Sequence, residues 1–452
     1  MKIVIVGDGK LGNTLAKQLS GEGHDVVIIE KNAQLVENSM NLLDITGVAG
    51  NGATIQIQKE ADVDKCDLFI SVTASDELNL LSCMMARKLG AKHTAARVRN
   101  PEYTEQIAFM RQHFGISMVL NPEFMAASVI SQNLRFPAAD HLETFARGRA
   151  ELIEIKVDEK SKLNGQKLSG LYRKYQVKVL VCAVQRGDEI IIPSGDFTIM
   201  AGDKINITAS PSAISSFLRA LGMYQDKIRS VMVVGGGRIG HYLCKMLSDA
   251  GMSVKLIEQN AEKCRRLSED LPKVSVLNDD GTNHEILREE GIDNMDAFVS
   301  LTGIDEENII LSMYASSKGV RKVVTKINRT SLIKLLDDSI LGTIVSPLLI
   351  TSNQIVRYTR SVQNSVGNGV RTLHRIINNQ VEALEFGITE KTDLVGVPLK
   401  ELPTKDNLLV ACIIRNNKVI IPDGNTTFEY GDSVIVVTTI PYLQDLKDII
   451  KQ

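Results

Sequence analysis

Short apolar runs alternate with helical patterns near the start of the chain. Four runs have the length and aliphatic content of buried strands, at residues 3–6, 26–29, 68–72 and 94–98. Between them, residues 11–19 and 78–89 carry apolar side chains at the spacing of an amphipathic helix. Strands that alternate with helices predict βαβ units with right-handed crossovers. We therefore expect a doubly wound parallel sheet.

The same pattern occurs twice in the chain. Residues 3–32 (IVIVGDGKLGNTLAKQLSGEGHDVVIIEKN) return as residues 231–260 (VMVVGGGRIGHYLCKMLSDAGMSVKLIEQN), 228 positions later. Further along the offset becomes 229, and residues 67–79 match residues 296–308. This internal duplication predicts two α/β units that open with the same motif.

The texture of the sequence changes after each α/β unit. Residues 151–157 (ELIEIKV) and 382–388 (EALEFGI) alternate apolar and polar positions, which is typical of half-buried antiparallel strands. Leu-x-Gly-x-x-Leu, Pro-x-Gly and Gly-Asp segments follow in both halves and supply turns between strands. The expected fold class is α/β, with two doubly wound parallel sheets, each followed by a small α+β domain. The expected domains are residues 1–140, 141–226, 227–364 and 365–452.

The composition is that of a folded protein with several domains. The chain has 452 residues, of which 44% are hydrophobic and 23% are charged, enough for several buried cores. The formal net charge is −2 and no long basic run occurs, so nonspecific binding to nucleic acid is not expected. Six cysteines are scattered without a Cys-x-x-Cys pair, which argues against a zinc site or disulfide framework and favours a reducing cytosol.

Neither a signal peptide nor a membrane span is expected. Met1 leads directly into the first predicted strand, which leaves no room for a signal peptide. Residues 339–356 carry no charge, but Pro347, Asn353 and Gln354 make this stretch more polar than a typical spanning helix. We expect it to form a buried interface helix between lobes, with a counterpart near residues 121–134.

A Gly-x-Gly-x-x-Gly motif follows the first strand of each repeat and opens the next helix. The first glycine permits a tight turn, the second lets a pyrophosphate approach the backbone, and the third allows helix–strand packing. Free N–H groups and the helix dipole stabilise a phosphate at such a helix start. In this context the motifs predict two Rossmann-like nucleotide sites. The motif residues are Gly7, Asp8, Gly9, Lys10, Leu11 and Gly12, and then Gly235, Gly236, Gly237, Arg238, Ile239 and Gly240.

An acidic residue ends the second strand of each repeat. Glu30 and Glu258 stand about 20 residues after the motifs, where a carboxylate accepts hydrogen bonds from both hydroxyls of a ribose. A 2′-phosphate at this position would be repelled. The sequence therefore favours NAD(H) over NADP(H).

Residues near the phosphate-binding turns are further candidate contacts. Lys10 and Arg238 have the reach to contact phosphate oxygens, and a solvated position on the first helical turn fits the pattern equally well. Thr73, with Ala74 beside it, and Thr302 end the fourth strands. We expect them to contact the distal ribose or the phosphates rather than to cap a helix.

Other strand ends have two interpretations each. Asn51-Gly52 and Asp280-Gly281 follow the third strands, where adenine or ribose contacts and a simple turn are both compatible with the sequence. Arg97 ends the fifth strand, where it either neutralises a ligand phosphate or forms a structural ion pair. Asp76 and Glu77 are expected to cap the following helix rather than to bind magnesium.

No catalytic constellation is recognisable in the sequence. A dehydrogenase needs a proton donor and groups that orient the substrate. None of the seven histidines lies in an acid–base arrangement, and His24 and His241, beside the motifs, are expected to pack or face solvent. We therefore expect no catalytic and no metal site. The alternative is an NAD-dependent oxidoreductase with the α+β units as substrate-binding or dimerisation domains.

The ordered set of Gly-x-Gly-x-x-Gly, acidic strand end, Thr-x-x-Asp-Glu-x-Asn and a small Leu-x-Gly, Pro-x-Gly, Gly-Asp domain resembles the RCK family, the regulators of potassium conductance. The tandem arrangement is similar to the regulatory subunits of Trk-type potassium uptake. The resemblance covers nearly the whole chain. It implies Rossmann lobes in a homo-oligomeric cytosolic ring, expected to be a tetramer with eight lobes.

Function and ligands also follow from this resemblance. It implies a protein peripheral to the inner face of the membrane, docked on a potassium-translocating membrane subunit of a Trk-type transporter, with nucleotide binding changing the shape of the ring. It implies NAD(H) as ligand, with ATP or ADP as candidates for the same cradles. One ligand would be held by Gly7, Gly9, Gly12, Glu30, Thr73 and Arg97, and the other by Gly235, Gly237, Gly240, Glu258 and Thr302.

Three departures from the family pattern predict that the two sites differ. Asp8 puts a negative charge beside the first phosphate cradle, where Gly236 stands in the second. Lys326 replaces Arg97 in the second repeat. Asn51 stands where an acidic residue is common in the family.

Overall fold

The chain folds into two compact units, each built from both repeats. One unit holds Met1–Ser131 and Ser230–Thr359, here called the first and second lobes, and the other holds Gln132–Arg229 and Arg360–Gln452. The boundaries predicted after residues 140, 226 and 364 fall at residues outside the described ones and stay predictions. The computed structural model describes residues 1–104, 106–135, 142–146, 148–223, 227–333, 341–363, 369–377, 380–388 and 392–451.

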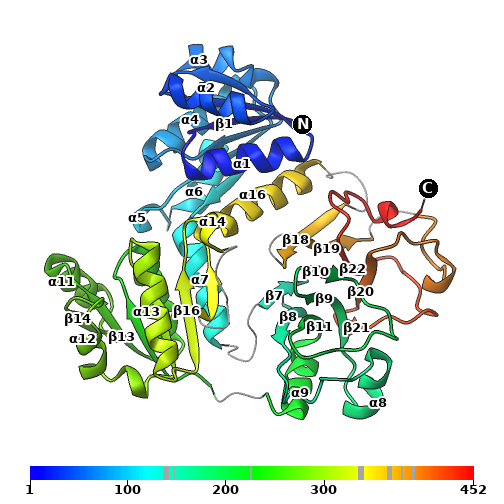
Figure 1. The fold of residues 1–452 in the computed structure, drawn as a ribbon. Coiled ribbons are helices and arrows are strands. Elements are labelled where there is room, and N and C mark those ends of the chain that lie inside the picture. Colours follow the sequence, from blue (N-terminus) through cyan, green and yellow to red (C-terminus); the bar gives the residue numbers. More distant parts are fainter. Residues whose placement is uncertain are drawn as a thin grey trace. The chain divides into compact units, whose positions relative to one another are not determined.

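Each lobe contains a parallel six-stranded sheet, drawn in blue to cyan and in green to yellow in Figure 1. The strand orders are β3-β2-β1-β4-β5-β6 and β14-β13-β12-β15-β16-β17, so the two sheets have the same doubly wound topology that the sequence predicts. The first sheet consists of β1 (Lys2–Val6), β2 (Asp25–Glu30), β3 (Thr46–Ala49), β4 (Leu68–Ser71), β5 (His93–Arg97) and β6 (Met118–Leu120). The second consists of β12 (Ser230–Val234), β13 (Ser253–Glu258), β14 (Ser275–Asn278), β15 (Ala297–Ser300), β16 (Lys322–Lys326) and β17 (Thr343–Val345).

Helices connect the strands of both lobes. The central strands are buried on both faces, with Ile3, Val4 and Ile5 fully inaccessible to solvent, as expected for a parallel sheet covered by helices. The first lobe has α1 (Lys10–Gly21), α2 (Ala33–Leu42), α3 (Ile55–Glu60), η1 (Val63–Lys65), α4 (Asp76–Leu89), α5 (Pro101–Thr104), α6 (Ile107–Phe114) and α7 (Pro122–Arg135). The second has α10 (Arg238–Asp249), α11 (Ala261–Asp270), α12 (His284–Glu289), η3 (Ile292–Asn294), α13 (Asp305–Ser317), α14 (Thr330–Ile333) and α16 (Pro347–Gln363).

The two helices expected at an interface, α7 and α16, each contact the other lobe. At the start of α7, Asn121 donates a hydrogen bond of 3.1 Å to the hydroxyl of Tyr242 in α10. Near the end of α16, the Tyr358 hydroxyl lies 3.4 Å from Nδ1 of His93 in β5. Residues 339–340 of the predicted interface stretch lie outside the described residues. Over the described part of the chain, every helix is too short or too polar to cross a membrane.

The second unit contains two antiparallel five-stranded sheets, one from each repeat. Their orders are β10-β9-β11-β8-β7 and β18-β19-β22-β20-β21. The strands are β7 (Leu142–Phe145), β8 (Ala150–Lys156), β9 (Leu180–Arg186), β10 (Glu189–Ile191), β11 (Lys204–Ala209), β18 (Val370–Ile376), β19 (Val381–Gly387), β20 (Leu408–Arg415), β21 (Lys418–Ile420) and β22 (Ser433–Thr438). The helical segments are η2 (Leu168–Gly170), α8 (Leu171–Tyr175), α9 (Pro211–Leu221), η4 (Leu399–Glu401) and η5 (Leu446–Ile449).

The prediction that the strands at 151–157 and 382–388 are half-buried is wrong. All of β19 and all but the last residue of β8 are buried. The reason is that the two antiparallel sheets share one apolar core, to which Leu152 and Cys182 contribute from the first repeat and Ala383 and Cys412 from the second. The glutamates of these strands, Glu151, Glu154, Glu382 and Glu385, are therefore buried carboxylates.

The Gly-Asp pairs do more than form turns. Asp203, fully buried after Gly202, accepts two hydrogen bonds of 2.8 Å from Arg186. Asp432 holds Arg415 in the same way in the second repeat, at 2.9 and 2.8 Å. Each pair ties the turn before the last strand to a neighbouring strand.

Candidate functional site

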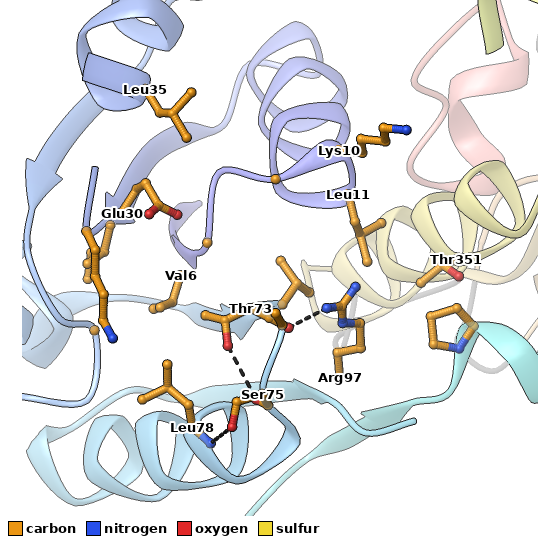
Figure 2. A pocket seen from close by; sticks show the side chains of 18 of the residues that line it. Val6, Lys10, Leu11, Glu30, Leu35, Thr73, Ser75, Leu78, Arg97 and Thr351 are labelled. Atoms are coloured by element: carbon orange, nitrogen blue, oxygen red, sulfur yellow. Dashed lines mark hydrogen bonds between the residues drawn. The ribbon is translucent and has the colours of Figure 1, made fainter. Parts of the chain in front are cut away.

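The candidate site is a cavity of about 760 Å³ at the carboxyl ends of the strands in the first lobe. The strand order reverses between β1 and β4 at this edge, which is where doubly wound sheets bind ligands. The volume is within the range of cofactor sites. Eight residues predicted from the sequence line the cavity, namely Gly7, Gly9, Lys10, Leu11, Glu30, Thr73, Ala74 and Arg97. Figure 2 shows Glu30 and Arg97 on different sides of it, with Thr73 between them.

The three glycines of the first motif have the geometry of a phosphate cradle. Gly7 has φ +99°, and a Cβ there would lie 3.2 Å from the backbone of Thr73. A Cβ on Gly12 would lie 1.8 Å from the carbonyl oxygen of Gly7, so the third glycine permits the close packing of α1 on the turn. A Cβ on Gly9 would meet no atom within 4 Å. The second glycine thus faces open space, where a ligand can approach the backbone.

The start of α1 is free to receive an anion. Gly9 is the N-cap residue, and among the described residues no side chain caps this helix or its counterpart α10, which starts after Gly237. The first-turn N–H groups and the positive end of the helix dipole favour a negative charge here. Lys10, on the first turn, also lines the cavity.

Glu30 is held by backbone amides and keeps capacity for a ligand. Its two carboxylate oxygens accept hydrogen bonds from the N–H groups of Asp8, at 3.0 Å, and Asn32, at 3.1 Å. A carboxylate has about four acceptor positions, so about two remain for the hydroxyls of a ribose. Glu258 has the same two contacts in the second lobe, from Gly236 at 3.0 Å and Asn260 at 2.9 Å.

Asn79 of α4 organises the end of β4, and sequence reasoning assigned it no role. Its Oδ1 accepts from the Thr73 amide and hydroxyl, both at 2.8 Å, and its Nδ2 donates to the carbonyl of Arg97 at 2.9 Å. Asn308 makes the matching bonds to Thr302 and Lys326 in the second lobe. The signal in the sequence is the asparagine that recurs at the same distance after each threonine.

Among the described residues, Arg97 forms a structural hydrogen bond in place of the ion pair that was one of its two interpretations. Its guanidinium donates to the carbonyl of Thr73, as the ammonium group of Lys326 does to Thr302. Its Nε is buried and has no hydrogen-bond partner among the described residues. Burial lowers the pKa of Arg97, and the charge of Arg99 nearby adds to this effect. Arg97 is thus a structural hydrogen-bond donor at the cavity, and its contact with a ligand phosphate stays a prediction.

The residue that caps α4 is Ser75, not Asp76 or Glu77. The Ser75 hydroxyl accepts from the amide of Leu78 at 3.1 Å. Asp76 instead accepts from the amides of Arg99 and Asn100, both at 2.8 Å, and so fixes the loop after β5. Asp76 lies at the helix start, but its side chain accepts hydrogen bonds from the neighbouring loop and not from the helix.

Three predicted residues of the first repeat are not among those lining the cavity. Asn51 forms the turn after β3, where its side chain accepts from the amide of Ala53 at 3.2 Å. In the second lobe Asp280 forms the matching turn, where its side chain accepts from the amide of Thr282 at 2.9 Å.

The other two residues, Gly12 and Asp8, also lie away from the cavity. Gly12 packs behind the cradle, and the carboxylate of Asp8 accepts from the hydroxyl of Ser39 in α2 at 2.6 Å. The expected negative charge of Asp8 beside the cradle is therefore directed away from the cavity.

Further residues line the cavity, namely Gly52 of the predicted Asn51-Gly52 turn and several residues that sequence reasoning missed. Gly52 fits here because a Cβ would lie 2.3 Å from a methyl group of Val6. The second lobe contributes Asn328 and the start of α16, which adds Pro347, Leu348 and Thr351. No local pattern in the first repeat predicts these contacts, because the residues lie more than 200 positions away in the sequence.

The cavity matches the charge pattern of a dinucleotide. Of the described residues that line it, Lys10, Lys31 and Arg97 are cationic and Glu30 is acidic. The cations and the helix start suit a pyrophosphate, and the carboxylate suits the hydroxyls of a ribose. Apolar side chains such as Leu35 and Leu78 provide surfaces for a flat ring.

Family models match both halves of the chain. Residues 3–122 and 231–347 match the TrkA-N domain, and residues 152–222 and 383–451 match the TrkA-C domain. The sequence is 32% identical over 451 residues to the Trk system potassium uptake protein TrkA homolog of Archaeoglobus fulgidus, with 100% of each chain covered. It is 30% identical over 452 residues to the Trk system potassium uptake protein TrkA of Vibrio alginolyticus, covering 99% of this chain and 98% of that protein.

Solved structures with the same fold include the crystal structure of the GsuK RCK domain. Its TM-score is 0.62 at 16% identity, covering 96% of this chain and 92% of that one. The GsuK channel bound to NAD also has a TM-score of 0.62 at 16% identity, covering 97% of this chain and 76% of that one. At this identity the likeness concerns the fold alone.

Proposed function

Because this chain belongs to the TrkA family of potassium-uptake proteins, we propose that it is a regulatory subunit that binds NAD(H) and gates a potassium-translocating membrane protein of the Trk type. The observation that carries the nucleotide part is the cavity of the first lobe, where an uncapped glycine-rich helix start and Lys10 lie together with Glu30. Gly7, Gly9 and Gly12 would cradle the pyrophosphate, Glu30 would hold a ribose, and Thr73 and Arg97 would bind farther along the ligand.

The ligand class is NAD(H) rather than NADP(H). Glu30 would repel a 2′-phosphate, and the cations of the cavity would neutralise a pyrophosphate. ATP and ADP carry the same adenosine and phosphate groups and compete for the cradle in this proposal. The bound ligand would supply negative charge and ribose hydroxyls, and the chain would use them as a signal rather than as a reactant.

A regulatory role is favoured over an oxidoreductase role by the residues at the site. The described lining includes no histidine, cysteine or tyrosine side chain, and both oxygens of Glu30 accept from backbone amides. A ligand can shift such a protein between two states only by its differential affinity for them.

In this proposal the subunit forms a tetrameric ring on the inner face of the membrane, with domains at residues 1–140, 141–226, 227–364 and 365–452.

The direct test is isothermal titration calorimetry of the full-length chain with NADH, NAD⁺, ATP and ADP. We expect NADH to bind the wild-type protein and Glu30→Ala to weaken it at least about tenfold, a loss of about 1.4 kcal/mol. Glu37→Ala, which removes an exposed acid of α2, is the matched control and should bind like the wild type. Tight binding of ATP or ADP without binding of NADH would overturn the assignment of NADH as the ligand. The absence of any binding would overturn the proposed role as a nucleotide sensor.

A further inference from the structure

The last helix of each lobe starts in contact with the other lobe. The start of α16 from the second lobe lines the cavity of the first, together with Lys10. The start of α7 from the first lobe contacts α10 through Asn121 and Tyr242, and the ring of Phe124 packs edge-on against Tyr242 at 5.5 Å. Each glycine-rich helix therefore has a partner helix from the other repeat.

The second residues of these partner helices differ in charge. Pro122-Glu123 opens α7, and Pro347-Leu348 opens α16. Leu348 lines the first cavity, and Oε1 of Glu123 lies 4.0 Å from the Arg238 guanidinium in α10. An acid thus stands near the second cradle where the first has a neutral side chain.

Glu123 is set among cations and lacks a full set of hydrogen bonds. Its side chain is 17% exposed, and its buried Oε2 has no hydrogen-bond partner among the described residues. Burial raises the pKa of Glu123, while the positive charges of Arg99, Arg238 and Arg97 oppose this effect. At the second cradle the carboxylate therefore competes with an incoming anion for Arg238, although its charge also acts on Arg97 of the first cavity.

Arg238 is the basic residue that follows the second glycine of its motif, and it is the first residue of α10. A phosphate at this helix start would share Arg238 with Glu123 and be repelled by its carboxylate. Access to Glu258, the carboxylate expected to bind a ribose in the second lobe, is also limited. Glu258 is only 9% exposed, and a methyl group of Leu267 packs close to Gly236. The corresponding contact in the first lobe is made by Ser39.

We propose that Glu123 is a specificity-determining residue that weakens pyrophosphate binding in the second lobe, so that the chain has one strong nucleotide site, in the first lobe, and one weak site. This inference rests on the proposed function, because it assumes that the first cradle binds a nucleotide. It assigns the unequal affinity to a carboxylate near the second site, and not to Asp8 at the first.

The test is NADH titration by calorimetry on full-length variants. With the first site disabled by Glu30→Ala, Glu123→Gln should raise NADH affinity at least about tenfold. The substitution removes a negative charge that repels the pyrophosphate where it would contact Arg238. Adding Glu258→Ala should abolish this gain. The reciprocal change, Leu348→Glu in the otherwise wild-type chain, should weaken the first site about tenfold. Thermal unfolding of each variant checks that the fold persists, and Gln keeps the shape of Glu.

The outcomes separate this inference from the proposed function. If the wild type binds NADH but Glu123→Gln gives no gain in the Glu30→Ala background, the inference is overturned and the proposed function stands. If only the Glu123→Gln variants bind NADH, the strong first site is overturned together with the proposed function, and only the weakening effect of Glu123 on the second site remains. Both are overturned if neither the wild type nor Glu123→Gln binds NADH.

Discussion

The carboxylate of Asp8 accepts a hydrogen bond of 2.6 Å from the hydroxyl of Ser39, and both side chains are buried. The matching positions in the second repeat are Gly236 and Leu267. There the leucine takes up the space, since its Cδ1 lies 2.6 Å from where a Cβ on Gly236 would be. One polar pair has thus been exchanged for one apolar contact at the same place in the fold.

This exchange predicts that the two positions are coupled. Ser39→Leu alone places an apolar side chain against a buried carboxylate and should destabilise the first lobe by about 3 kcal/mol. Asp8→Gly alone should cost about 1–2 kcal/mol, because it removes hydrogen bonds. The double variant reproduces the arrangement of the second lobe and should be more stable than the sum of the single changes by about 1–3 kcal/mol. Urea denaturation of the four proteins measures this coupling, and strictly additive effects would contradict it.

Asn79→Ala should reduce both stability and nucleotide binding. Asn79 is fully buried and bridges Thr73 and Arg97, so its removal leaves buried polar groups unpaired at a cost of about 3 kcal/mol. NADH affinity should fall at least about tenfold, because both bridged residues line the cavity. Asn308→Ala is the matched control, with a similar loss of stability and no change at the first site. Wild-type NADH affinity in Asn79→Ala would show that the network does not position the site.

Glu382 in the second unit is the shared partner of two arginines. It accepts two hydrogen bonds of 2.9 Å from Arg360, which is 2% exposed, and one of 3.3 Å from Arg375. Glu382→Leu should therefore destabilise by about 3–5 kcal/mol. Arg360→Met should cost less, because Arg375 still compensates the carboxylate. Thermal unfolding ranks the two variants, and the reverse order would rule out the shared role of Glu382.

Glu151, at the position of the first repeat that matches Glu382, should make the stability of the protein depend on pH. It is 6% exposed, and burial raises its pKa. A carboxyl group whose pKa is higher in the folded than in the unfolded state stabilises the fold when it is protonated. This stabilisation is complete below the unfolded pKa of about 4.3 and is lost as pH rises through the folded pKa. Glu151→Gln should remove that loss and stabilise the protein at pH 7. Unfolding midpoints from pH 4 to 8 test this, and Glu382→Gln, which weakens an ion pair, should instead destabilise at pH 7.

The sequence alone was enough to predict the fold class, the duplication and eight of the residues that line the candidate cavity of the first lobe. Local patterns specify these features, because apolar runs, helical spacing and glycine-rich turns depend on neighbours within a few residues. Gly7, Gly9, Glu30 and Thr73 are at the cavity for this reason. The strands β7 and β18, which precede the predicted antiparallel strands, were not anticipated.

Only the tertiary structure decided how the repeats combine. It pairs lobe with lobe and antiparallel sheet with antiparallel sheet, and this buries carboxylates such as Glu151 that the alternating pattern assigns to solvent. It also directs Asp8 toward Ser39 and brings Glu123 to Arg238, across 115 positions of sequence. Side-chain direction and long-range contact depend on which surfaces pack together. A local sequence pattern contains the chemistry of each residue but not the identity of its distant neighbour.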